Sequence, residues 1–234
     1  MPLIPETVNV PVTNPSKLRV TIMGQPKSGK SSFAVQNPKA IVMDTDNEGT
    51  QFLKCFRVSV TDWVTFGQAL AELAKPENKD RFDTIVIDTV DMLWQRCREY
   101  VCNKNGVNHE SEDKGFGRLW DLVRAEFMRA MAFISKNGWG VWLITHTVQK
   151  EVKVQGIKRQ VTTTTLPANA ARVVMAMSDV ITYLDVNEDG TRTLCVKAED
   201  TLECGDRTGH LKENIRFNSP DKGYNDFVGT FTKE

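Results

Sequence analysis

Short apolar runs alternate with amphipathic segments over the first two thirds of the chain. Runs rich in β-branched and other apolar residues predict buried strands at 18–23, 40–43, 56–60, 84–87 and 141–145. Helices are expected between them, at 30–36, 63–74, from 89 to about 102, and at 119–135. This alternation over residues 18–146 predicts an α/β fold in which a mostly parallel sheet is flanked by helices on both faces.

The pattern changes after residue 150. Residues 151–165 alternate around Gln155-Gly156, and two further apolar runs flank Asp189-Gly190, which is a hairpin turn signal. A helix is expected between these hairpins, at 169–178. The hairpins predict an antiparallel extension at one edge of the sheet, and residues 200–234 are polar enough to predict mainly loops.

Length and proline content suggest how the chain is divided. A chain of 234 residues fits one core with small additions. Residues 1–16 contain several prolines and no helical period, so we expect an extended N-terminal arm. The core is predicted to span 17–217 and a C-terminal tail 218–234.

Charge and cysteine usage restrict the partners. Lys+Arg and Asp+Glu both number 30, so any nucleic-acid contact must come from a local basic patch. No apolar run is long enough to predict a membrane span, and the N-terminus lacks the pattern of a secretory signal. The five cysteines form no CxxC pair, which argues against a zinc site and favours a reducing cytoplasm.

One motif carries specific chemistry. Residues 24–31 fit the pattern GxxxxGK[ST], and Ser32 follows; in order they are Gly24, Gln25, Pro26, Lys27, Ser28, Gly29, Lys30 and Ser31. The glycines let the backbone curl around a phosphate, and a following helix aims its positive end at the same place. Lys30 is predicted to reach the β- and γ-phosphates and the Ser31 hydroxyl to bind magnesium. Because a strand precedes the motif and a helix follows it, a chance match is disfavoured.

Polar residues end the neighbouring strands. Asp88 closes the strand at 84–87, where a carboxylate holds magnesium through water in this architecture. Asp46 and Glu48 follow the strand at 40–43, and either one is a candidate to orient the attacking water; the alternative is a solvated acidic turn. His146 ends the strand at 141–145, either as a sensor of the γ-phosphate or as a histidine hydrogen-bonded at a strand end.

The first hairpin is basic. Residues 150–165 contain only one acidic residue, Glu151, and four basic ones: Lys150, Lys153, Lys158 and Arg159. Such a patch can bind a phosphate backbone, with release of counterions at each contact. The alternative is an edge hairpin whose lysines oppose aggregation.

Several sequence blocks resemble a known group. GQPKSGKSS, MDTDNEG, DTIVIDTVDML and VWLITH have the order and spacing of the RecA-type ATPase core. The later blocks TTTTLPANAARVVMAMSDVITYL and LCVKAED…GDRTGHL resemble small phage-encoded AAA-type ATP-binding proteins, a group that includes the single-strand annealing recombinases of bacteriophages. The resemblance covers about residues 17–217 and implies a RecA-like P-loop core.

The resemblance implies roles for the motif residues. Lys30 and Ser31 match the Walker A lysine and hydroxyl, and Asp88 matches the Walker B aspartate. Asp46 stands where RecA-like proteins place a catalytic glutamate; its shorter side chain is a departure that implies slow hydrolysis or the use of Glu48 instead. His146 stands where the RecA core places a glutamine sensor.

The resemblance also implies partners. Residues 103–117 and 150–165 correspond to the two DNA-binding loops, and Lys197 or Arg207 to a residue that reaches the γ-phosphate of a neighbouring subunit. The arm at 1–16 is implied to pack on a neighbour or else to fray. The implied protein is a phage ATPase in the cytoplasm of the bacterial host, which uses ATP and Mg²⁺, forms a ring or filament of identical subunits, and binds single-stranded DNA to promote annealing or recombination. A replication helicase or helicase loader, or a nucleotide-gated scaffold with little hydrolysis, remains an alternative.

Overall fold

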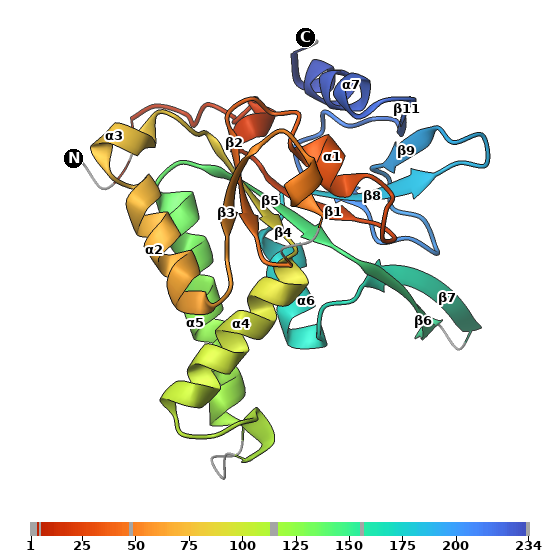
Figure 1. Cartoon of the computed structure of the whole chain (residues 1–234). Helices are drawn as coiled ribbons and strands as arrows, with labels where there is room; N and C mark the ends of the chain where they lie inside the picture. Colours follow the sequence, from red (N-terminus) through yellow and green to blue (C-terminus); the bar gives the residue numbers. More distant parts are fainter. Residues whose placement is uncertain (1–3, 5, 47–48, 113–116, 155–156, 233–234) are drawn as a thin grey trace.

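The computed structural model describes residues 4, 6–46, 49–112, 117–154 and 157–232. Its centre is a large twisted sheet with helices on both faces (Figure 1). In the described residues the strands of this sheet are β1 Arg19–Met23, β2 Ala40–Asp44, β3 Phe56–Ser59, β4 Thr84–Asp88, β5 Gly140–Thr145, β8 Val180–Val186, β9 Arg192–Cys195, β10 Gly205–Asp206 and β11 Ile215–Phe217. The helices are α1 Lys30–Ala34, α2 Trp63–Leu73, α3 Pro76–Lys79, α4 Val90–Lys104, α5 Arg118–Lys136, α6 Ala168–Met177 and α7 Pro220–Thr232.

The strand order is β11-β9-β8-β1-β5-β4-β2-β3, with β10 paired to β8. The six strands from β8 to β3 are parallel, so their carboxyl ends share one edge of the sheet. The strands β9, β10 and β11 are antiparallel to their neighbours and extend the sheet at its C-terminal side. The predicted α/β class, mostly parallel with an antiparallel extension, is therefore confirmed.

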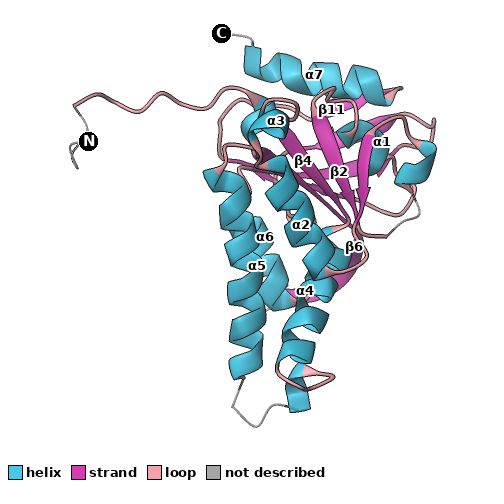
Figure 2. Cartoon of the chain, turned by 60° about the vertical axis from the view of Figure 1, so that its left-hand side comes forward, coloured by secondary structure: helices cyan, strands magenta, loops and turns pink. Residues whose placement is uncertain are grey.

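Alternate residues of the central strands pack against two different helical layers. Ile85 and Ile87 of β4 belong to a core with α2, α4, α5 and α6, whereas Val86 faces the opposite side. That opposite side is covered by α1 and α7, as Figure 2 shows. Because both faces are covered, the central strands β1, β2, β4 and β5 are buried at nearly every position, which matches the apolar runs of the sequence. The edge strand β3 is instead mostly exposed, so the expectation of a buried strand at 56–60 is wrong there.

The first hairpin forms at the predicted residues but does not join the main sheet. Its strands are β6 Thr147–Val154 and β7 Ile157–Thr164, and they pair only with each other among the described strands. The expectation that this hairpin extends the sheet edge is wrong, because β6 continues straight from β5 beyond the end of the sheet. The hairpin therefore projects from the body of the molecule (Figure 1).

The chain end differs most from expectation. Residues 220–232 form α7 rather than a loop, and its buried Phe227 and Phe231 pack on a cluster that contains Phe33 and Trp142. Conversely, the helix after the phosphate loop is shorter than predicted and covers only Lys30–Ala34. No helix in the described part of the chain is long and apolar enough to cross a membrane.

Candidate functional site: a phosphate loop with carboxylates at the sheet edge

The phosphate-loop motif joins β1 to α1 at the edge where the parallel strands end. Two of its positions require glycine. A Cβ on Gly24 would lie 2.8 Å from the carbonyl oxygen of Leu184, and Gly29 has a φ of +99°, in the left-handed region. The loop therefore curls tightly at this edge, because neither position has a side chain.

Lys30 is held inside the curl of the loop. Its Nζ donates to the carbonyl oxygens of Gly24, at 2.9 Å, and Gln25, at 2.8 Å, and the residue is only 5% exposed. Burial lowers the pKa of Lys30 to about 8, although the charges of Asp88 and Asp91 oppose this effect. A polyphosphate bound in the loop would place negative charge next to Lys30 and stabilise its buried ammonium group.

Asp88 lies at the end of β4, next to the Ser31 hydroxyl. It is 8% exposed; burial raises its pKa to about 6, the hydrogen bond from Ser31 lowers it, and the charges of Asp46 and Asp44 raise it further. A carboxylate beside a hydroxyl is a donor set that suits Mg²⁺, which takes one or two carboxylates and completes its shell with phosphate oxygens and water. Asp88 and Ser31 therefore fit the predicted magnesium role.

Asp46 and His146 lie together beyond Asp88. Burial raises the pKa of Asp46, the charge of His146 lowers it, and the Thr89 hydroxyl donates to Asp46 Oδ1 at 3.4 Å. The Nδ1 atom of His146 is buried without a hydrogen-bond partner in the described structure, so a polar ligand atom could pair with it. The other candidate for the water-orienting role, Glu48, lies outside the described residues.

Asp44, by contrast, has structural partners. Its carboxylate accepts a hydrogen bond from the Thr50 hydroxyl and forms an ion pair of 3.1 Å with Arg57. These contacts fix the turn that follows β2. They leave Asp46 as the described carboxylate of this turn that is free to act on a ligand.

A cavity of about 520 Å³ brings the predicted residues together. Nine of the residues predicted from the sequence line it: Pro26, Lys27, Gly29, Lys30, Ser31, Ser32, Asp46, Asp88 and His146. Gly24, Gln25 and Ser28 are not among its described lining residues, and the Ser28 hydroxyl is buried without a partner in the described structure. The cavity also contains Arg192, which the sequence did not reveal.

The four basic hairpin residues do not form one patch. The strand register pairs Lys150 with Val161 and Val152 with Arg159, so Lys150 and Arg159 share one face, and the alternation places Lys158 on the other. Lys158 pairs with Glu151 at 2.9 Å, and Arg159 pairs with Asp200. Lys153 is opposite Lys158 in the register, and nothing beyond its backbone is described.

The root of the hairpin is bonded to the phosphate loop. Gln25 Nε2 donates to Thr147 Oγ1 at 3.2 Å, and the hydroxyls of Thr145 and Thr164 are 2.6 Å apart. The Thr165 N–H donates to the His146 carbonyl oxygen at 3.0 Å. His146 itself separates β5 from β6, so it belongs both to the cavity and to the hairpin root.

The remaining candidates lie away from the cavity. Lys197 follows β9 and Arg207 follows β10, both toward the amino ends of the parallel strands, and Arg207 bonds to the Ala176 carbonyl oxygen and to Asp179. Contact of either residue with a nucleotide therefore requires a second chain. Of the predicted DNA-binding loop at 103–117, residues 113–116 lie outside the described residues; residues 105–112 lie at the end of α4 far from the sheet (Figure 2), where Glu110 pairs with Arg98.

This site defines a P-loop nucleotide-binding protein. The sequence matches the AAA_24 family, described as an AAA domain, over residues 16–208, and the chain belongs to this family. It is 25% identical over 179 residues to the SPbeta prophage-derived uncharacterized protein YorG of Bacillus subtilis (strain 168), in a match that covers 72% of this chain and 50% of YorG. The chain thus spans about half the length of this curated relative. A solved structure of the RadB recombinase is similar with a TM-score of 0.46 and 13% identity, over 77% of this chain and 80% of that one.

Proposed function

We propose that this protein is a phage ATPase that binds single-stranded DNA and promotes strand annealing or recombination as a homo-oligomer. The observation that carries this proposal is the position of His146, which lies in the nucleotide cavity and at the root of the projecting hairpin. A change at the γ-phosphate would therefore reach the hairpin through a single residue. The similarity to a prophage-derived protein supports a phage setting.

Hydrolysis would use the groups that line the cavity. The loop N–H groups and Lys30 would bind the phosphates, and Ser31 and Asp88 would hold Mg²⁺, which supplies charge neutralisation at the phosphate oxygens when bound. Asp46 would orient the attacking water and accept its proton. Because an aspartate is one methylene shorter than a glutamate, we expect slow turnover.

Coupling to the hairpin would follow the hydrogen bonds at its root. Gln25 of the phosphate loop holds Thr147, and His146 holds Thr165, so both strands are tied to the cavity. If a γ-phosphate oxygen formed a hydrogen bond with the unpaired Nδ1 of His146, it would fix the backbone at residue 146 and, through it, the root of the hairpin. Hydrolysis would release this hold, a ligand-dependent ordering of a DNA-contacting segment.

DNA contact is proposed for the hairpin face that presents Lys150. The described contacts leave Lys150 without an ion pair, and the neighbouring Val148 and Val152 are each 36% exposed. Lys158 and Arg159 are held by exposed carboxylates, and such surface ion pairs contribute only about 0–1 kcal/mol. DNA phosphates can therefore replace Glu151 and Asp200 at little cost.

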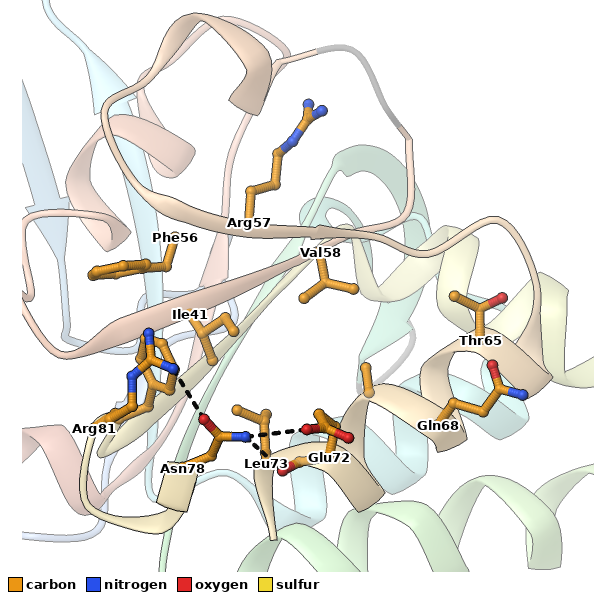
Figure 3. A pocket seen from close by; sticks show the side chains of 12 residues that line it. Ile41, Phe56, Arg57, Val58, Thr65, Gln68, Glu72, Leu73, Asn78 and Arg81 are labelled. Carbon is orange, nitrogen blue, oxygen red and sulfur yellow. Dashed lines mark hydrogen bonds between the residues drawn. The ribbon is translucent and has the colours of Figure 1, made fainter. Parts of the chain in front are cut away.

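Self-association is proposed to use the arm and the outermost strand. Val8 and Val10 of the arm are 92% and 82% exposed, and Figure 2 shows the arm leaving the body. Beside the outermost strand β3, a cavity of about 630 Å³ lies between β2 and β3 on one side and α2 and α3 on the other; its lining includes the apolar side chains of Phe56, Val58 and Leu73 together with polar ones (Figure 3). An extended apolar arm of a second copy fits an open strand edge that has pockets for alternate side chains.

The function is tested by ATP turnover with and without single-stranded DNA, measured together with strand binding at several salt concentrations. We expect DNA to stimulate turnover, and Lys150→Ala to lower the slope of log affinity against log salt by about 0.7, one phosphate contact. Lys212→Ala, an exposed lysine outside the hairpin, is the matched control. No strand binding at low salt would refute the proposal. Translocation on forked DNA would favour a helicase. Equal, negligible turnover in the wild type and in Lys30→Ala would favour a scaffold.

Self-association has its own test, sedimentation of the protein with nucleotide. Val10→Asp should abolish assembly by placing a charge on the apolar side of the arm. Asn9→Asp introduces the same charge one residue away and should leave assembly intact. Assembly that survives Val10→Asp would exclude the arm as the contact.

A further inference from the structure

Arg192 enters the nucleotide cavity from the side opposite to the carboxylates. Asp88 ends β4, and Asp46 and His146 follow β2 and β5; these three strands all lie on one side of β1 in the sheet. Arg192 begins β9, two strands away on the other side of β1. Because β9 is antiparallel and Arg192 is paired with Val186, its first residue lies at the carboxyl edge, beside the phosphate loop.

Arg192 is fixed against the loop by one of its nitrogens. Its Nε donates to the Ser28 carbonyl oxygen at 2.8 Å. A Cβ on Gly29 would lie 2.9 Å from the same Nε, so the guanidinium packs on the backbone of the residue that curls the loop. The position of the arginine and the conformation of the loop are therefore linked.

The remaining nitrogens of Arg192 have no protein partner. Within the described residues, Nη1 and Nη2 make no hydrogen bond and no ion pair, although Arg192 lines the cavity. Arg216 on the neighbouring strand forms an ion pair of 2.5 Å with Asp189 in the turn between β8 and β9. An unpaired guanidinium beside a phosphate loop is a ready partner for an anion, since its planar donors match phosphate oxygens in pairs.

We propose that Arg192 binds the phosphates of the nucleotide held by its own chain, with Nη donors on phosphate oxygens while Nε stays on the loop. This inference rests on the proposed nucleotide function and deepens it. The polyphosphate would lie between cations on the β9 side, Lys30 and Arg192, and carboxylates on the β4 side, where magnesium is expected. One chain would then neutralise the phosphates without a basic residue from a neighbour.

The test is equilibrium binding of magnesium ADP and of a magnesium complex of a non-hydrolysable ATP analogue to purified variants. Arg192→Ala and Arg192→Gln should each weaken binding about 10- to 100-fold, the range for a lost charged hydrogen bond. Arg192→Lys should fall in between. Arg216→Ala, which removes an arginine from the adjacent strand, should bind like the wild type.

The glutamine variant separates phosphate binding from support of the loop. Glutamine can still donate to the Ser28 carbonyl oxygen but has no charge, so binding restored by Arg192→Gln would overturn the inference. The Lys30→Ala variant distinguishes failure of this inference from failure of the proposed nucleotide binding. If Lys30→Ala loses affinity while the Arg192 variants keep it, only this inference fails; if Lys30→Ala binds normally, the nucleotide function fails. Melting curves without nucleotide identify any variant that has not folded.

Discussion

Replacing Asp88 with asparagine should stabilise the protein in the absence of nucleotide, because the fold holds this carboxylate where water solvates it poorly. Burial raises the pKa of Asp88 from 3.8 to about 6. A group whose pKa is higher in the folded state contributes its stability fully below the unfolded value, and that contribution is lost as the pH rises through about 6. The difference corresponds to about 3 kcal/mol, since one pKa unit corresponds to about 1.4 kcal/mol.

The variant should therefore exceed the wild type by about 1–3 kcal/mol in the free energy of unfolding at pH 8, and by almost nothing at pH 3. At about 2–4 °C per kcal/mol for a chain of this size, the melting temperature rises by about 2–12 °C. Thermal and urea unfolding at the two pH values measure this, with Asp226→Asn at an exposed position of α7 as the control. The same variant should lose magnesium-dependent nucleotide binding. A gain of equal size at both pH values, or no gain at pH 8, would refute the account of Asp88.

Three further outcomes follow from the same geometry. Nucleotide affinity should peak between about pH 6 and 8, because Asp88 gains a proton below this range and Lys30 loses one above it; a flat titration profile would contradict both assignments. Asp46→Asn should lower turnover by about 100-fold or more with little change in nucleotide affinity, and Asp46→Glu should stay active; unchanged turnover in the asparagine variant would exclude it as the base. Gly140→Ala should lower the free energy of unfolding by about 1–3 kcal/mol, because its Cβ would lie 2.1 Å from a main-chain oxygen. Gly67→Ala meets open space in α2 and should stabilise the protein by about 0.5–1 kcal/mol. Chemical denaturation compares the two variants, and equal effects would contradict this packing.

The parallel core and the phosphate loop could be predicted because their physical requirements are local. A strand buried on both faces must be apolar at nearly every position, as at 84–87 and 141–145. The loop needs glycine at positions 24 and 29, and the GxxxxGK[ST] motif places a glycine at both. Residues that end adjacent parallel strands must meet at one edge, which is why Asp88 and His146 could be assigned to one site.

The parts that escaped prediction depend on distant partners. The helix α7 contains Gly223 and Gly229, which disfavour a helix, and it is stabilised by packing of Phe227 and Phe231 on the core. Arg192 reaches the cavity only because β9 is antiparallel and starts at the correct edge. That pairing brings together residues 164 positions apart in the chain.

The basic hairpin shows a different limit. Its composition indicated one patch, but side chains of a strand alternate between two faces, and the register separates Arg159 from Lys158. Two acidic residues then form ion pairs with Lys158 and Arg159, and one of these acidic residues, Asp200, comes from a loop beyond the hairpin. Charge counted along a sequence therefore overestimated the charge available on one surface.

The central claim is that the loop at residues 24–31 binds magnesium nucleoside triphosphate through its amides and Lys30. Calorimetric titration of ATP with Mg²⁺ into the wild type and into Lys30→Glu tests it most directly. We predict one site per chain in the wild type and affinity weaker by at least about 100-fold in the variant, with an unchanged fold by circular dichroism. Equal affinity in the two proteins, or no binding in the wild type, would contradict the claim.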